Sequence, residues 1–120
     1  MEGRLAPVQT LYRILVKYGH CKDNKAAFGS LLRISGSNVY AYLRDADDPR
    51  RINVRPETLH AWCWAIRQVT SLEIVVRLDF LGELSLEVGG CDDSGAEIER
   101  KVYLTNYADF SVTKPWEFTD

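Results

Sequence analysis

The chain has 120 residues, of which 46% are hydrophobic and 27% are charged, with a formal net charge of −2. This length and composition are typical of one small globular domain, or of one domain with an appendage. No apolar run approaches the roughly 20 residues that a membrane-spanning helix needs. The first residues also lack the apolar segment of a signal peptide. We therefore expect a cytoplasmic protein without a membrane partner.

Charge is divided unevenly along the chain. Residues 1–68 carry 11 Lys+Arg and 6 Asp+Glu, a net of +5, whereas residues 69–120 carry 4 Lys+Arg and 11 Asp+Glu, a net of −7. A positive surface attracts phosphates and a negative one repels them, so the two halves are suited to different partners.

The positive half is expected to form four short helices, because its apolar residues recur at the i, i+3, i+4, i+7 spacing. The first covers residues 7–19, with Pro7 in the first turn and Gly19 at the stop. The second covers residues 25–33 and is capped by Asp23 or Asn24. The third runs from a corner at residues 34–36 to about residue 44, and the fourth opens at Pro56.

Two details of the helices matter for packing. Gly29 costs roughly 1 kcal/mol relative to Ala in an exposed helix interior, so we expect it to admit close approach of the third helix. Ser35 or Ser37 can cap that third helix. In the fourth helix, Trp62 and Trp64 cannot share one face; Trp62 is expected in the core, and Trp64 at the helix–sheet junction or in an interface.

Near residues 69–71 the hydrophobic period changes from 3.6 to 2, which predicts β-strands. The expected strands cover residues 72–80, 84–88 and 97–104, with a possible short fourth strand over residues 110–113 and an aromatic tail over 115–118. The residues expected on the buried side of the first strand are Leu72, Ile74, Val76, Leu78 and Phe80, and those of the third are Ile98, Val102 and Leu104.

The predicted fold is therefore α+β. Residues 1–68 form a four-helix bundle containing a helix-turn-helix, and residues 69–120 add a small antiparallel sheet of three to four strands. A small sheet with one apolar face and an open edge needs cover from its own helices or from another chain. We expect a homodimer that forms through these C-terminal strands.

Nothing in the sequence predicts catalysis. The only histidines, His20 and His60, lie near no glycine-rich elbow, and there is no phosphate-binding glycine loop. Cys21, Cys63 and Cys91 match no zinc motif or redox pair, so we expect three reduced thiols, with Cys63 buried. We expect no enzyme activity, no metal site and no cofactor.

Residues 8–68 resemble the Cro and lambda-repressor-like (XRE-type) helix-turn-helix family of DNA-binding proteins. Gly29 stands at the family's small position, residues 32–35 (Leu-Arg-Ile-Ser) form the corner, and Val39 and Tyr42 supply the buried pair of the next helix. Residues 56–66 match the supporting helix. Arg33 departs from the family, which commonly has Gly there; a left-handed conformation at Arg33 would cost about 1–2 kcal/mol. The β-part lies outside the resemblance.

The resemblance implies a set of DNA contacts. Asn38 can pair with adenine, and Arg44 with guanine or a phosphate. The residues that would face base edges are Ser35, Ser37, Asn38, Tyr40, Ala41 and Arg44, and the candidates for backbone contacts are Lys25, Arg33, Arg50, Arg51 and Arg55. The competing interpretation makes Asn38 and the serines mere caps and surface groups, and Arg50 and Arg51 a solvated loop beside residues 47–48.

We predict a dimeric transcriptional repressor of the phage or plasmid type that binds double-stranded DNA at an inverted repeat. One alternative is an inhibitor or adaptor whose acidic β-part binds a host protein, with the helix-turn-helix serving autoregulation. Another is an antitoxin whose β-part binds its toxin.

Overall fold

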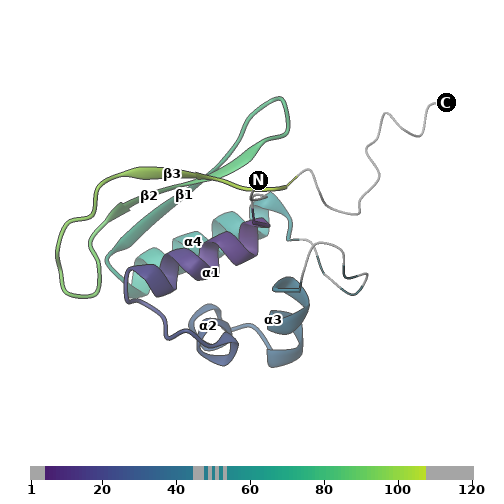
Figure 1. Ribbon diagram of the computed structural model, residues 1–120, viewed down its shortest axis with the longest axis horizontal. Helices are drawn as coiled ribbons and strands as arrows, with labels where there is room; N and C mark the ends of the chain where they lie inside the picture. The colour runs from purple at the N-terminus through teal and green to yellow at the C-terminus, as the bar shows by residue number, and fades with distance from the viewer. Residues whose placement is uncertain (1–4, 45–47, 49, 51, 53, 108–120) are drawn as a thin grey trace.

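The computed structural model describes residues 5–44, 48, 50, 52 and 54–107, which form four helices followed by three strands (Figure 1). This confirms the predicted α+β class and the order of its elements. The helices are α1 (Pro7–Lys17), α2 (Lys25–Leu32), α3 (Gly36–Tyr42) and α4 (Pro56–Val69), and the strands are β1 (Leu72–Leu78), β2 (Leu84–Gly90) and β3 (Lys101–Leu104).

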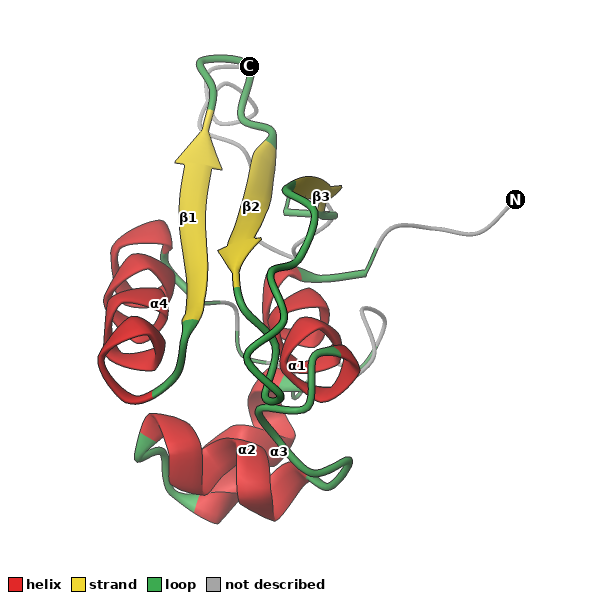
Figure 2. Cartoon of the chain, turned by 90° about the vertical axis from the view of Figure 1, so that its left-hand side faces the viewer, coloured by secondary structure: helices red, strands yellow, loops and turns green. Residues whose placement is uncertain are grey.

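The strands form one antiparallel sheet in the order β1-β2-β3. Ile74 pairs with Val88, and Leu86 pairs with Tyr103, which fixes the side chains that share the inner face. Helices α1 and α4 cover this face, and α2 and α3 lie on the far side of them from the sheet (Figures 1 and 2). Helices α1 and α4 thus separate the β1–β2 hairpin, residues 72–90, from α2 and α3.

A single hydrophobic cluster joins the helices to the sheet. Leu11 and Leu15 of α1, Leu59 of α4, and Leu72 and Leu86 of the sheet are all completely buried members of it. The inner face of the sheet is therefore covered by helices of its own chain. None of the four helices in the described part of the chain has the length and hydrophobicity that a membrane-spanning helix requires.

The helix termini follow the chemistry of the sequence. Asn24 caps α2, since its Oδ1 accepts a hydrogen bond of 2.6 Å from the backbone N–H of Ala27. Proline occupies the first turn of both α1 and α4, as predicted. Ser35 occupies the N-cap position of α3 without a side-chain hydrogen bond to that helix.

Trp62, Trp64 and the three cysteines lie largely as expected. Trp62 packs against the core, and Trp64 is 57% exposed at the junction of α4 and β1. All three cysteines are free, and Cys63 is buried. Burial raises the pKa of the Cys63 thiol to about 12.

The predicted inner face of the sheet was wrong at two places. The inner alternation of β1 was expected to continue to residue 80, yet Leu78 is exposed and Phe80 is 96% exposed, because the hairpin extends past the helices that would cover them (Figure 1). In β3, Val102 and Leu104 face outward, because the register with β2 places Tyr103 opposite the buried Leu86.

The third strand is also shorter than predicted, beginning at Lys101 instead of residue 97. An isolated bridge between Cys91 and Glu97 closes the preceding loop, and Ile98 still packs against the core. The predicted strand over residues 110–113 and the aromatic tail lie outside the described residues.

Candidate nucleic-acid interface

The connection between α2 and α3 is a corner of three residues, 33–35, which brings the two helices into close contact. A Cβ atom added to Gly29 would lie 2.5 Å from Cγ2 of Val39 and 3.1 Å from the carbonyl oxygen of Ile34. Val39 is almost completely buried beneath this contact. The expectation that Gly29 admits the following helix is confirmed, because no larger side chain fits there without a shift.

Arg33 forms the bend itself. Its φ of 58° and ψ of 43° place it in the left-handed region, at the C-cap of α2. The following N–H, of Ile34, donates to the carbonyl oxygen of Gly29 at 2.9 Å, which closes the end of the helix. Glycine is favoured at such a position, so Arg33 stores about 1–2 kcal/mol of backbone strain. Its side chain is exposed.

Aromatic contacts hold α2 and α3 on the helices that cover the sheet. The ring of Tyr12 in α1 meets that of Phe28 in α2 edge-on, with 5.1 Å between centroids. The ring of Tyr42 in α3 meets Trp62 of α4 in the same way, also at 5.1 Å. Such pairs contribute roughly 0.5–1.5 kcal/mol each beyond the area they bury, so the corner has a fixed orientation relative to the core.

The open face of α3 carries unengaged polar groups. Ser35, Ser37, Asn38 and Tyr40 are exposed, while Ala41 is half-buried. The side chains of Ser35, Ser37 and Asn38 make no hydrogen bond to any residue that the structure describes. Their donors and acceptors are therefore available to a ligand.

Lys25, which is predicted to contact the DNA backbone, lies beside Tyr40, which is predicted to face a base edge. The ammonium group of Lys25, in the first turn of α2, is 5.1 Å from the centre of the Tyr40 ring. A shallow groove runs between the two helices here, lined by residues that include Lys25, Gly29, Ser30, Gly36 and Tyr40. The structure thus brings these two candidate residues together on one surface.

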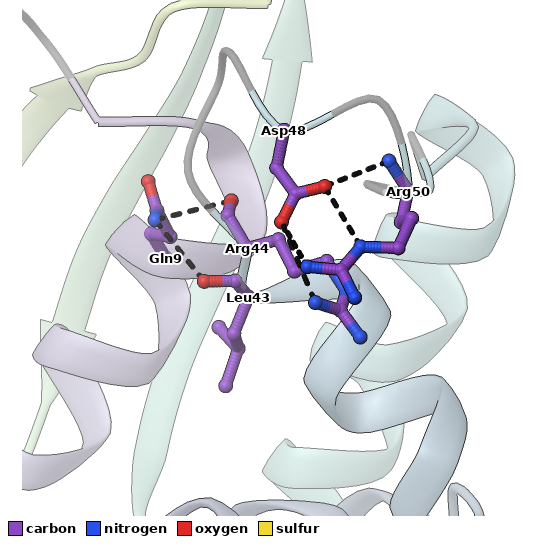
Figure 3. Close-up of polar contacts among 5 residues, drawn as sticks. All are labelled: Gln9, Leu43, Arg44, Asp48 and Arg50. Atoms are coloured by element: carbon purple, nitrogen blue, oxygen red, sulfur yellow. Dashed lines mark hydrogen bonds and ion pairs between the residues drawn. The ribbon is translucent and has the colours of Figure 1, made fainter.

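The C-terminal end of α3 is fixed by contacts that Figure 3 shows. Gln9 of α1 donates through Nε2 to the carbonyl oxygens of Leu43 and Arg44, at 3.3 and 3.5 Å. Asp48 lies between the guanidinium groups of Arg44, at 3.4 Å, and Arg50, at 3.1 Å (Figure 3). Hydrogen bonds from the Arg50 side chain and backbone lower the pKa of Asp48 to about 2.

These contacts engage two residues that were predicted to bind DNA, Arg44 and Arg50. Arg44 is half-buried against Asp48, and its Nε is buried without a hydrogen-bond partner among the described residues. Arg50 is exposed but shares the same carboxylate. Both side chains would have to leave or share Asp48 in order to contact DNA.

The remaining candidates for backbone contacts are more open. Lys25, Arg33 and Arg55 are exposed, and Arg55 occupies the N-cap position of α4. Arg51 lies outside the described residues.

Gln9, Arg13 and Lys17 lie beside Lys25 but were not among the predicted site residues. Arg13 and Lys17 line a groove of about 390 Å³ together with Gln9, Tyr12, Asp23 and Lys25. Their i, i+4 spacing, which places two cations on one face of α1, was the available signal. The contact from Gln9 to the end of α3 had no signal in the sequence, because it joins residues more than thirty positions apart.

Comparison with protein-family models, with curated proteins and with solved structures found no match to this chain.

Proposed function

We propose that this protein is a sequence-specific DNA-binding regulator that places α3 in the major groove. The observation that carries the proposal is the α2–α3 corner, in which Gly29 packs on Val39 and Arg33 makes the bend. The side chains of Ser37 and Asn38 are exposed and make no hydrogen bond within the part of the chain that the structure describes. A helix held by its buried face, with a short polar face left open, is the arrangement that a helix-turn-helix needs.

The distribution of charge supports the same proposal. Lys25 and Arg33 are exposed on the two ends of α2, where they can contact phosphates on either side of the groove. The β1–β2 hairpin, which carries Glu73, Asp79, Glu83 and Glu87, lies on the other side of α1 and α4 from α2 and α3, so it would not face the DNA (Figure 1). We propose that Asn38 reads a base, and that Tyr40, held beside Lys25, contacts a sugar or phosphate.

A helix of only seven residues reads few base pairs, so the regulator is proposed to act as a dimer on an inverted repeat, and as a repressor. Selection of bound duplexes from a random DNA library tests this. We expect enrichment of an inverted repeat whose half-sites are about 10 base pairs apart, centre to centre. Recovery of unenriched sequence would argue against it.

A second candidate function is supported by the tip of the β1–β2 hairpin, residues 79–83. Phe80 and Leu81 are 96% and 81% exposed. The turn that presents them is ordered, because Oδ1 of Asp79 accepts from the N–H groups of both Leu81 and Glu83 at 2.9 Å. An exposed apolar tip flanked by carboxylates suits a basic-rimmed pocket on another protein, as an inhibitor, adaptor or antitoxin would require.

One variant can distinguish DNA binding from protein binding by the hairpin tip. The double variant F80S/L81S removes the apolar tip without touching α2 or α3. If the second candidate is correct, a protein that co-purifies with the unaltered chain is lost from this variant, while DNA binding is retained. If no such protein is bound by the unaltered chain, the candidate fails.

A further inference from the structure

The sheet has two edges, and they differ in how open they are. β3 is only four residues long and begins with Lys101, and the chain that follows it is tied down where the N–H of Asn106 donates to the carbonyl oxygen of Leu5 at 2.8 Å. Short edge strands and edge lysines are common means of preventing strand pairing. β1, in contrast, has seven residues and contains no Lys, Pro or Gly.

The register of the sheet shows which backbone groups β1 presents at its outer edge. The N–H of Asp79 donates to Glu83, and the N–H of Cys91 donates to Ser71, both at 3.0 Å. In an antiparallel ladder the bonded positions alternate, so the odd-numbered residues of β1 direct their N–H and C=O groups to β2. Ile74, Val76 and Leu78 therefore direct theirs outward, whereas the N–H of Leu72 is bonded to Oγ1 of Thr70.

We propose that a second copy of this chain occupies that edge, with two β1 strands paired antiparallel about a two-fold axis at Val75. In this register Ile74 faces Val76 of the partner strand, and Leu78 donates to Leu72. About six backbone hydrogen bonds would join the strands without displacing the Thr70 contact. The two three-stranded sheets would become one sheet of six strands, with helices α1 and α4 of both copies on the same face.

Charge complementarity favours this register. Glu73 and Arg77 lie two residues on either side of Val75, on the outer face of the strand. A two-fold axis at Val75 places Glu73 of each copy opposite Arg77 of the other, at the closely spaced, non-hydrogen-bonded positions. Shifting the axis by one residue toward the C-terminus would instead place Glu73 opposite Asp79, a pair of like charges.

The surface beside the edge also suits a partner strand. A shallow groove of about 180 Å³ runs between α4 and β1, lined by His60, Cys63, Trp64, Arg67 and residues 73–75. Figure 2 shows α4 next to β1, the outermost strand on this side of the sheet. The exposed indole of Trp64 and the partly exposed Val75 would be covered by the incoming strand.

Arg77 has a partner within its own chain, and the exchange leaves that partner paired. Glu87 binds Arg77 at 2.8 Å and Arg100 at 2.7 Å. When Arg77 turns to Glu73 of the second copy, Glu87 keeps Arg100. This dimer is the one that the proposed function invokes, but the pairing does not depend on DNA binding, so a failure to bind DNA would leave it standing.

Sedimentation equilibrium of the full chain, without DNA, tests the register. We expect a dimer, a dissociation constant raised about tenfold in E73R and in R77E, and recovery of dimerisation in E73R/R77E. K101E is the matched charge-reversal control, because Lys101 lies on β3 at the opposite edge of the sheet and takes no part in the Glu87 ion pairs; it should leave the dissociation constant unchanged.

A second variant, V76P, removes an outward N–H and should weaken the dimer independently of charge. Circular dichroism establishes that each variant is folded. A monomeric unaltered chain at micromolar concentration, or a double variant that stays as weak as the two single variants, would overturn the proposal. A dimer that binds no DNA would contradict only the proposed function.

Discussion

The ammonium group of Lys25 lies 5.1 Å from the centre of the Tyr40 ring, which joins the first turn of α2 to the open face of α3. A cation and a phenol are thus presented side by side above the corner formed by residues 33–35. This arrangement depends on the two helices being held close together, and the packing of Gly29 on Val39 sets that distance.

We predict that Gly29→Ala lowers the free energy of unfolding by about 1–2 kcal/mol, although Ala is the better helix former. The added methyl group would meet Cγ2 of Val39. In the G29A background, Val39→Ala should cost less than it does alone, since it makes room for the new methyl group. Urea unfolding of the four proteins of this double-mutant cycle measures the coupling.

Ser30→Ala, which changes an exposed position on the same helix, is the control and should have little effect. A G29A protein more stable than the parent would show that α3 does not depend on this close approach.

Arg33 has a strained left-handed backbone and a charged side chain, and two substitutions can distinguish the effects of the strain from those of the charge. Arg33→Gly should raise the free energy of unfolding by about 1 kcal/mol, because glycine adopts φ of 58° freely. If Arg33 contacts a phosphate, the same change should reduce the salt dependence of DNA binding by about one unit of slope. Arg33→Lys keeps the charge and the strain, so it should change neither quantity. A less stable R33G would contradict the account of the bend.

Asn38 is predicted to read a base without supporting the fold. Asn38→Ala should leave the free energy of unfolding within about 0.5 kcal/mol of the parent, because the side chain is exposed and makes no hydrogen bond to a described residue. Preference at one base pair should fall by about 1–3 kcal/mol, as measured by competition among single-base variants of the bound duplex.

The matched control is Asn24→Ala. It removes the cap of α2 and should cost about 1 kcal/mol of stability while leaving base preference unchanged. If N38A and the parent discriminate all base pairs equally, α3 does not read DNA through this residue.

Asp48 gives the fold a dependence on acid pH. Its pKa falls from 3.8 to about 2 because Arg50 hydrogen-bonds the carboxylate, so its stabilising effect is present above about pH 4 and is lost as the pH falls through about 2. The difference in free energy of unfolding between the parent and Asp48→Asn should be constant at neutral pH and shrink between about pH 4 and pH 2. A difference that does not change over this range would show that the contact in Figure 3 is absent in solution.

The sequence predicted the parts of the fold that local chemistry determines. Asn24 and the two helix-initial prolines mark helix starts, the period change near residue 70 marks the first strand, and Gly29 signals close packing. It failed at Val102 and Leu104 because the alternation of a strand specifies two faces but not which of them is covered. The pairing of Tyr103 with Leu86 places Tyr103 on the covered face of the sheet.

In the candidate site, too, local sequence predicts some features and tertiary packing determines others. The exposure of Ser37, Asn38 and Tyr40 follows from helical spacing around the buried Val39. The engagement of Arg44 with Asp48 depends on how the chain returns after α3, which helical periodicity does not encode. Phe80 is likewise exposed because the hairpin extends past the helices beneath it. This depends on how the hairpin is placed relative to the helices, which the sequence of either element alone does not reveal.

The central claim is that the α2–α3 corner binds DNA with sequence preference. The most direct measurement is a mobility shift with the DNA upstream of this protein's own coding region against a shuffled duplex of equal composition, repeated over a range of salt. We predict tighter binding of the upstream duplex, and an affinity that falls linearly with salt on logarithmic axes. Equal affinity for the two duplexes, or no binding at low salt, would contradict the claim.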